Sequence, residues 1–211
     1  MSGMQSRMAG AAAVLLGLLF WSGPVRSQAP EAAADVVRLA ELLAVREGSV
    51  VADIGAGSGP LTVGIAPRVG STGRVYSTDI NAQRLQEIRD AAARAGLKNV
   101  TVTEGAPSRT NLPDGSCDGI FMRDVYHHFA DPAQMNASLF RTLKPGGRIA
   151  VVDFVPETRR SAPPGSRNQG VEHGIYPEDV IEELKGAGFV QVLQVDWSSP
   201  GYFVVVGQRP R

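Results

Sequence analysis

The stretch that most constrains the fold is VVADIGAGSG, residues 50–59. Val50, Val51 and Ile54 have the character of a buried strand, and glycines follow at every second position before a helical pattern begins. A strand that passes through a glycine-rich turn into a helix typically binds a ligand. Glycine accepts positive φ and lets a ligand approach the backbone, and the first N–H groups of the helix favour polar or anionic groups. In an open parallel sheet this corner lies at the carboxyl end of the strands, where ligands bind.

The spacing of these glycines narrows the ligand class. The order is Asp53-x-Gly55-x-Gly57-x-Gly59, and Pro60 stands where the dinucleotide fingerprint G-x-G-x-x-G has its third glycine. A nicotinamide-dependent oxidoreductase is therefore the least favoured of the function classes considered. A glycine-rich turn that binds nothing remains the structural alternative.

The length and composition of the chain exclude several other kinds of protein. The 211 residues suffice for one α/β domain with a full core but not for two comfortable domains. The 21 basic and 21 acidic residues balance, so no basic excess indicates a nucleic-acid partner. A single cysteine, Cys117, excludes an internal disulfide and a cysteine-rich metal site.

The N-terminal 29 residues are predicted to be a secretory signal peptide that precedes the domain, residues 30–211. Arg7 provides a positive charge, residues 9–21 form a short apolar run, and Ser22-Gly23-Pro24 breaks it. Cleavage is expected before Gln28. This predicts an exported or periplasmic protein. An uncleaved N-terminal segment anchored in the inner membrane is the main alternative, and a cytoplasmic location is the other.

Helical and strand patterns alternate along the rest of the chain, which implies a parallel sheet with right-handed crossovers. The last two strands are close enough for a hairpin, so the final strand should be antiparallel to its neighbour. The region 155–175 lacks periodicity and is predicted to be a surface loop or lid. The turn 144–147 should end a helix that begins at 132. Helices are expected at 31–47, 61–66, 81–95 and 177–185, and strands at 50–54, 74–79, 100–104, 117–123, 148–154, 190–197 and 202–207.

A carboxylate ends the second predicted strand. Asp79 lies twenty residues beyond Gly59, where a carboxylate can accept two hydrogen bonds from ribose hydroxyls. The alternative role is helix capping, by Asp79 or by Asn81. Both roles are compatible, and ribose binding is favoured.

Five stretches, in order, resemble the class I S-adenosylmethionine (SAM)-dependent methyltransferases, and most closely their type 11, ubiquinone-methyltransferase-like group. The resemblance extends from about residue 36 to the C-terminus. It implies a Rossmann-like, doubly wound α/β fold with a seven-stranded, mostly parallel sheet and an antiparallel C-terminal hairpin strand. The stretches are VADIGAGSG (51–59), STDIN (77–81), NLPDGSCDGIFM (111–122), DVYHHFADP (124–132) with RTLKPGGRIAVVDF (141–154), and EDVIEELKGAGF (178–189).

The resemblance also implies cofactor contacts. Asp53 would order the glycine turn and the amino group of the ligand, Asp79 would hold the ribose hydroxyls, and Ile80 would pack on the adenine. Arg123 and Asp124 would lie near the methionine part and the transferred methyl group. The backbone that passes the methionine part would be that of Gly55, Ala56, Gly57 and Gly59.

The adenine end departs from the pattern of the group. The loop after the third strand usually has an aspartate that contacts the adenine amino group. Here the corresponding stretch is Glu104-Gly105-Ala106, so Gly105 takes the place of that aspartate. Gly105 and Ala106 are still expected to line the adenine.

Three histidines are candidates for acting on the methyl acceptor. A general base is needed only if the acceptor arrives protonated. His128 and His173 are the predicted catalytic residues. Adjacent histidines are expected to point different ways, so at most one of His127 and His128 should face the site. Structural histidines are the alternative. No metal site is predicted, because no third ligand follows at recognisable spacing.

The predicted function is methyl transfer from SAM to a small-molecule acceptor. The alternative is a non-catalytic or degenerate SAM- or nucleoside-binding protein, which Gly105 and the export-like N-terminus favour. No nucleic-acid partner is expected, and membrane contact is expected only through an uncleaved N-terminal segment. The sequence leaves the acceptor and the oligomeric state open.

Overall fold

The computed structural model describes residues 28–197 and 199–211. In these residues one sheet of seven strands has the order β3-β2-β1-β4-β5-β7-β6. Strands β1 to β5 run parallel, whereas β7 is antiparallel to both β5 and β6. The predicted fold class is therefore confirmed. The strands are β1 (Val50–Ile54), β2 (Arg74–Asp79), β3 (Val100–Glu104), β4 (Cys117–Arg123), β5 (Leu143–Phe154), β6 (Val190–Val195) and β7 (Tyr202–Gln208).

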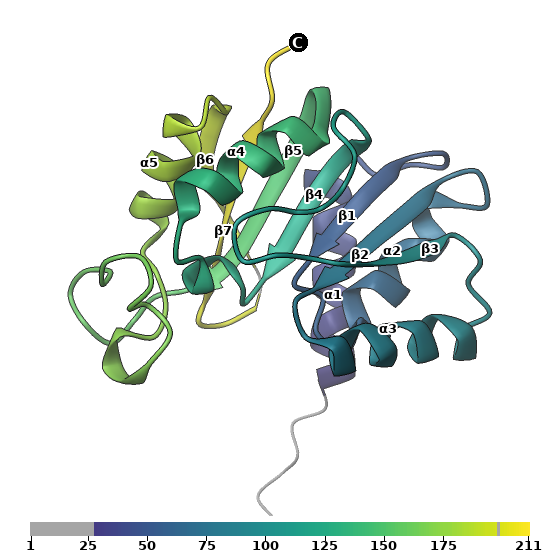
Figure 1. Ribbon diagram of the computed structural model, residues 1–211, viewed down its shortest axis with the longest axis horizontal. Coiled ribbons are helices and arrows are strands. Elements are labelled where there is room, and N and C mark those ends of the chain that lie inside the picture. The colour runs from purple at the N-terminus through teal and green to yellow at the C-terminus, as the bar shows by residue number, and fades with distance from the viewer. Residues whose placement is uncertain (1–27, 198) are drawn as a thin grey trace, which may run out of the picture.

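Helices cover both faces of this sheet (Figure 1). Leu39 of α1 and Ile65 of α2 belong to one buried cluster, together with Phe121 of β4. Leu139 of α4 and Leu184 of α5 belong to a second cluster on the opposite face. Helix α3 packs beside α2 against β2 and β3. The helices are α1 (Gln28–Leu42), α2 (Pro60–Val69), α3 (Ala82–Arg94), α4 (Pro132–Thr142) and α5 (Pro177–Gly186).

Two helices end at positions different from those predicted. Helix α1 stops at Leu42 rather than at 47, because Ala44 adopts a left-handed conformation with φ of 52° that a right-handed helix cannot continue. Helix α2 continues past Pro67 to Val69. The proline removes one intrahelical hydrogen bond, but only part of a turn follows it.

The sequence Lys144-Pro145-Gly146-Gly147, predicted to be a turn, instead lies within β5. Cys117 pairs with Leu143 but Gly119 pairs with Arg148, so the register shifts between these two pairs. The extra residues form a bulge in the strand. A proline and two glycines are compatible with a bulge as well as with a turn, which explains the difference.

Strand β1 lies between β2 and β4, although the chain visits β2 and β3 before it returns to β4. Such a reversal of strand order opens a crevice at the carboxyl ends of the strands. The 22-residue connection between β5 and α5, residues 155–176, contains the short 3-10 helix η2 (Gly170–Glu172) and lies beside this edge. The segments that carry the predicted site therefore converge here.

The predicted signal segment lies largely outside the described residues. Its last two residues, Gln28 and Ala29, are the first two of α1. None of the described helices has both the length and the apolar character needed to cross a bilayer. The signal peptide stays a prediction.

Candidate active site

The turn after β1 has the conformation that its glycines predict. Gly55 and Gly57 have φ of 69° and 57°. A Cβ at Gly55 would lie 2.5 Å from a methyl group of Val125, whereas a Cβ at Gly57 would meet nothing within 4 Å. The backbone N–H of Ala56 donates to the carbonyl of Thr78, 2.8 Å away. The turn is thus held against the end of β2 and leaves open space beside Gly57.

Asp79, at the end of β2, holds this turn through its carboxylate. Its Oδ2 accepts a hydrogen bond from the backbone N–H of Gly57 at 3.0 Å, and its Oδ1 accepts one from Asn81 at 2.9 Å. The N-cap of α3 is Asn81, whose side chain accepts from the backbone N–H groups of Gln83 and Arg84. Asp79 is therefore not the cap. The next residue, Ile80, has 66% of its surface exposed, which is unusual for a large apolar side chain.

Two adjoining cavities lie along this edge of the sheet, and both are lined by Gly55, Arg84 and Asp124. Their volumes are about 640 and 710 Å³, within the range of small-molecule sites. The first is also lined by Asp79, Ile80, Gly105, Ala106 and His128. The second is also lined by Asp53, Ala56, Gly57 and Arg123.

Of the predicted cofactor residues, Gly59 alone lines neither cavity. It lies against α3, where a Cβ would come within 3.3 Å of Ile88. In this structure Gly59 allows α3 to pack closely, and its contact with the cofactor stays a prediction.

Asp53 is buried beneath the turn. Its Oδ2 accepts a hydrogen bond from the Thr62 hydroxyl at 2.6 Å, and that hydroxyl is 2.7 Å from Ser77 Oγ. Burial raises the pKa of Asp53 to about 7, although the Thr62 hydrogen bonds oppose the rise. The side chain ties β1 to α2 and lies at the wall of the second cavity.

Arg123 is held by residues from both ends of the chain. Its Nε lies 3.0 Å from Oδ2 of Asp35 in α1, and its guanidinium lies over the ring of Tyr202 in β7, 4.3 Å from the ring centre. An aspartate is ordinarily exposed, but Asp35 is 1% exposed, because it faces Arg123 and accepts a hydrogen bond from Ser199 at 2.7 Å. The ion pair with Arg123 offsets the free-energy cost of burying the Asp35 carboxylate.

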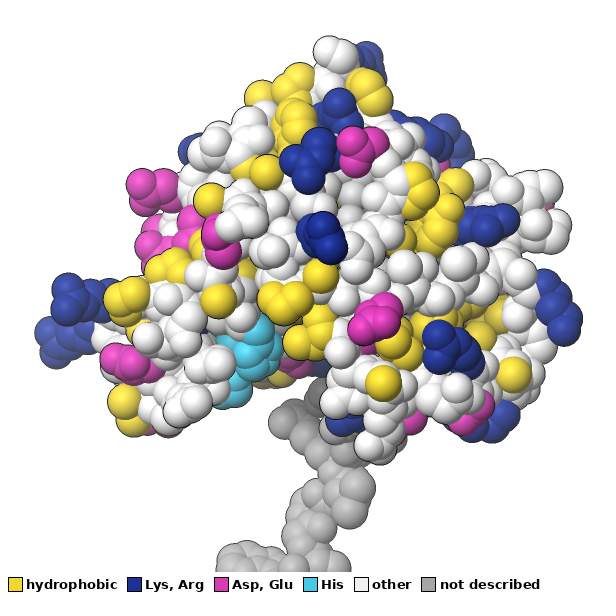
Figure 2. Space-filling model, in the orientation of Figure 1, with side chains coloured by type: hydrophobic (Ala, Val, Ile, Leu, Met, Phe, Trp, Pro, Cys, Tyr) yellow, Lys and Arg dark blue, Asp and Glu magenta, His cyan; other side chains and the backbone are white. Residues whose placement is uncertain are grey.

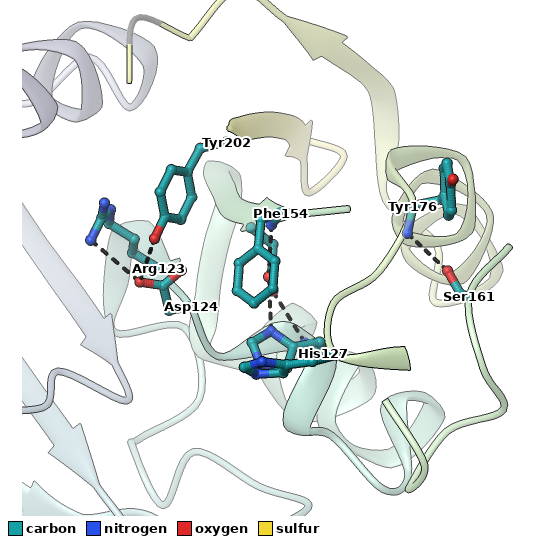
Figure 3. A network of polar contacts seen from close by, with 9 residues as sticks. Arg123, Asp124, His127, Phe154, Ser161, Tyr176 and Tyr202 are labelled. Carbon is teal, nitrogen blue, oxygen red and sulfur yellow. Dashed lines mark hydrogen bonds and ion pairs between the residues drawn. The ribbon is translucent and has the colours of Figure 1, made fainter. Parts of the chain in front are cut away.

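Asp124 lines both cavities and has an oxygen that is free to accept a further hydrogen bond. Its Oδ2 accepts a hydrogen bond from the Tyr202 hydroxyl at 3.2 Å and lies 3.3 Å from Arg123 (Figure 3). Its Oδ1 is buried and has no hydrogen-bond partner among the described residues. The backbone has φ of 59°, a conformation that aspartate tolerates better than most residues. Burial raises the pKa of this carboxyl.

The histidines meet at one end of the first cavity. His127 and His128 lie on the 3-10 helix η1 (Tyr126–His128), and their ring centres are 4.0 Å apart. Nε2 of His173 is 3.0 Å from Nε2 of His127. Buried His127 contacts Asp153 through Nδ1 at 2.8 Å, whereas His128 is exposed and lines the cavity. Of the adjacent pair only His128 lines the cavity, which agrees with the expectation that at most one of them faces the site, although the tight 3-10 turn keeps the two rings close together.

The surroundings of His128, at the exposed end of the cluster, favour its neutral form. Burial and the two neighbouring histidines lower the pKa of His128.

Cys117 lies in the core, and burial raises the pKa of its thiol to about 11, so it is not a reactive group. Tyr126 is also a core residue, and its hydroxyl accepts a hydrogen bond from Asn136.

Residues 52–151 match the family model described as "Methyltransferase domain". Two curated relatives are named ubiquinone/menaquinone biosynthesis C-methyltransferase UbiE. The protein from Marinomonas sp. is 38% identical over 111 residues, which are 52% of this chain and 44% of that protein. The protein from Hydrogenovibrio crunogenus is 33% identical over 120 residues, 56% of this chain and 47% of that protein. The chain therefore spans a little under half the length of these relatives.

Solved structures resemble the whole described fold. A SAM-dependent methyltransferase from Aquifex aeolicus has a TM-score of 0.71 and 27% identity, over 84% of this chain and 90% of that one. The [4+2]-cyclase SpnF has the same TM-score with 17% identity, over 84% and 81% of the two chains, and is similar in fold alone.

The chain has the fold of the class I SAM-dependent methyltransferases, as its similarity to the Aquifex aeolicus structure indicates. Within that class, the match to the family model and to the UbiE relatives supports the type 11 group that the sequence resembles. The sequence resemblance is therefore confirmed.

The residues present fit SAM, the cofactor of this family. The unpartnered, buried oxygen of Asp124 suits a cationic group. The open space at Gly57 admits a ligand against the backbone, and exposed Ile80 offers an apolar surface to a base. Three residues of this site were not singled out from the sequence: Asp35, Tyr202 and Asp153. They come from distant segments, and only their polar character in otherwise apolar surroundings hinted at a role.

Proposed function

We propose that this protein transfers the methyl group of SAM to a small-molecule acceptor bound beside His128. The observation that carries the proposal is Asp124. Asp124 lines the cavity beside Gly55 of the glycine turn and His128, and one oxygen of its carboxylate is buried without a hydrogen-bond partner among the described residues. The family and the solved relatives support the cofactor, but the acceptor is our inference.

In this proposal the cofactor lies across both cavities. Gly55, Ala56 and Gly57 pass the methionine part, while Asp53, Arg123 and Asp124 lie near it. The ribose hydroxyls are held by Asp79. The adenine is packed by Ile80, Gly105 and Ala106, whose lining of the first cavity supports this assignment.

When bound, SAM supplies a methyl group that its sulfonium has already activated. The protein has to place a nucleophile in line with that methyl group and exclude water. Val125, Phe129 and Met135 line the first cavity with apolar surface, and Asp124 provides a carboxylate there. A fixed carboxylate stabilises a cationic reacting group without reorganisation.

The cavity walls favour an acceptor that is flat, apolar and hydroxylated. Apolar side chains suit a ring, and His128, which lines the cavity and has a lowered pKa, can accept a proton from a ring hydroxyl, because neutral imidazole is a proton acceptor. The UbiE relatives are named for C-methylation in quinone biosynthesis, which is compatible with this chemistry. We therefore propose a hydroxylated aromatic or quinol-type acceptor, with His128 and His173 as the candidate catalytic residues.

The test is a methyl-transfer assay on the full chain with methyl-labelled SAM and a set of mono- and dihydroxylated aromatic compounds. The informative variant is Asp124→Asn, because asparagine tolerates the left-handed backbone and changes only the charge. We expect labelled product from the unmodified chain and a loss of about 10–100-fold in kcat/KM in the variant, the range for a charged hydrogen bond. Asp114→Asn, an exposed aspartate outside both cavities, is the matched control. Equal activity of Asp124→Asn and the unmodified chain would contradict the proposal.

A further inference from the structure

All three histidines of the chain meet in one place. One ring nitrogen from each lies within 4.8 Å of the other two. His173 comes from the connection that precedes α5, far in sequence from His127 and His128. The spacing of the histidines in the sequence does not indicate that His173 joins the other two, but the fold brings it beside them. The histidine side chains form a single cyan patch on the surface in Figure 2.

Buried His127 has the environment of a metal-ligating histidine. Its Nδ1 is 2.8 Å from Oδ1 of Asp153, and its backbone N–H donates to Oδ2 of the same residue at 3.2 Å. Both side chains are almost fully buried. A carboxylate on one ring nitrogen fixes the tautomer and directs the other nitrogen, here Nε2, toward a metal.

We propose that His127, His128 and His173 form a binding site for a divalent transition-metal ion, with Zn²⁺ as the best match. Imidazole nitrogens suit Zn²⁺, and three protein ligands leave a fourth tetrahedral position open. Bonds of 2.0–2.1 Å place neighbouring ligand nitrogens roughly 3.3 Å apart. The 3.0 Å between the Nε2 atoms of His127 and His173 is already close to this value.

The remaining adjustment is small. His128 and His173 are exposed, so their rings can turn toward a common ion without rearranging the core. His128 also lines the first cavity, together with Gly55 and Asp79. The open position of the ion would therefore be available to a water molecule or to an oxygen of a molecule in that cavity. Metal binding would occur whether or not the proposed methyl transfer takes place.

The composition of the chain makes this inference easy to test. No other histidine competes for the ion, and the single cysteine is buried with a raised pKa. The experiment is a titration of the full chain, carrying an affinity tag without histidines and stripped with a chelator. Zn²⁺ binding is followed by calorimetry, and Co²⁺ binding by its visible absorption.

We expect one Zn²⁺ per chain and a Co²⁺ spectrum of tetrahedral type. His173→Ala and His128→Ala change exposed side chains, so these variants should fold, which thermal melting without metal verifies. Each should weaken Zn²⁺ binding by at least about 100-fold. Asp153→Asn keeps the shape of the side chain that orients His127 and should weaken binding by about 10–100-fold. Asp114→Asn should bind as the unmodified chain does.

Two results would overturn the site. One is the absence of Zn²⁺ binding at micromolar concentration in the folded, unmodified chain. The other is equal Zn²⁺ affinity in the unmodified chain and in folded His173→Ala. Either would leave the cluster as hydrogen-bonded imidazoles, with one ring N–H donating across the 3.0 Å contact.

Discussion

Asp53 shows how a single buried carboxyl can make stability depend on pH. Its pKa is raised to about 7 in the folded chain from an ordinary value of 3.8. Between these two values the unfolded chain loses the proton while the folded chain keeps it. The folded state binds more protons, so the free energy of unfolding falls as pH rises from about 4 to about 7.

We therefore expect Asp53→Asn to remove this part of the pH dependence. The Asn side chain can still accept the Thr62 hydrogen bond but does not ionise. Relative to the unmodified chain, the variant should gain stability between pH 4 and 7, by an amount on the order of 3–4 kcal/mol at most. Urea unfolding at a series of pH values measures it, with Asp114→Asn as control. Parallel pH profiles of Asp53→Asn and the unmodified chain would show that Asp53 ionises normally.

Gly105 differs from the turn glycines because its backbone does not require glycine. Its φ is not positive, and a Cβ would meet its nearest neighbours, Asp79 O and Thr78, at an ordinary 3.7 Å. Gly55→Ala, by contrast, would place a Cβ 2.5 Å from Val125 at a positive φ.

Gly105→Asp should accordingly fold normally and bind SAM more tightly, by about 5-fold for one added hydrogen bond to the adenine. Gly55→Ala should lose about 1–3 kcal/mol of stability through backbone strain, with further loss from the clash. Thermal melting and calorimetric titration with SAM measure both effects. A Gly105→Asp variant that melts as low as Gly55→Ala would refute the conformational distinction between the two glycines.

Helix α1 is fixed to the rest of the fold by its buried Asp35. The carboxylate contacts Arg123 of β4 at 3.0 Å and accepts a hydrogen bond from Ser199 at 2.7 Å. Removing one partner of a buried ion pair leaves the charge of the other partner uncompensated. The cost is reduced here, because the Arg123 side chain is 25% exposed and also lies over Tyr202.

Asp35→Ala should destabilise the chain by about 1–3 kcal/mol in urea unfolding. Glu41→Ala is the matched control on the same helix, since its pair with Arg38 is at the surface and should cost less than about 1 kcal/mol. Equal losses in the two variants would mean that Asp35 does not anchor α1.

Local patterns were sufficient to predict most of the elements and the cofactor edge. The strand VVADI, the glycines after it and Asp79 at the end of β2 each fix local conformation, and parallel strand order brings their ends together. Element ends were less predictable, as at Ala44 and in the bulge of β5, because tertiary pairing decides them.

What the sequence could not provide were contacts between distant segments. Arg167 lies in the region 155–175 that was predicted to be a surface loop or lid, yet it is 5% exposed and pairs with Glu183 of α5 at 2.9 Å. His173 likewise meets His127 across 46 positions. No short-range periodicity encodes such pairs, because they depend on how the connection before α5 folds back on the sheet.

For the whole molecule, we propose that the edge at β1, β2 and β4 binds SAM through the Asp79 carboxylate. The most direct test is calorimetric titration of the full chain with SAM and with S-adenosylhomocysteine, beside Asp79→Ala and the control Asp114→Ala. We predict saturable binding of both ligands at one site, retained in Asp114→Ala and weakened at least about 10-fold in Asp79→Ala, with that variant shown to be folded by melting. No binding of either ligand to the unmodified chain, or equal affinity in the folded Asp79→Ala variant, would contradict the account.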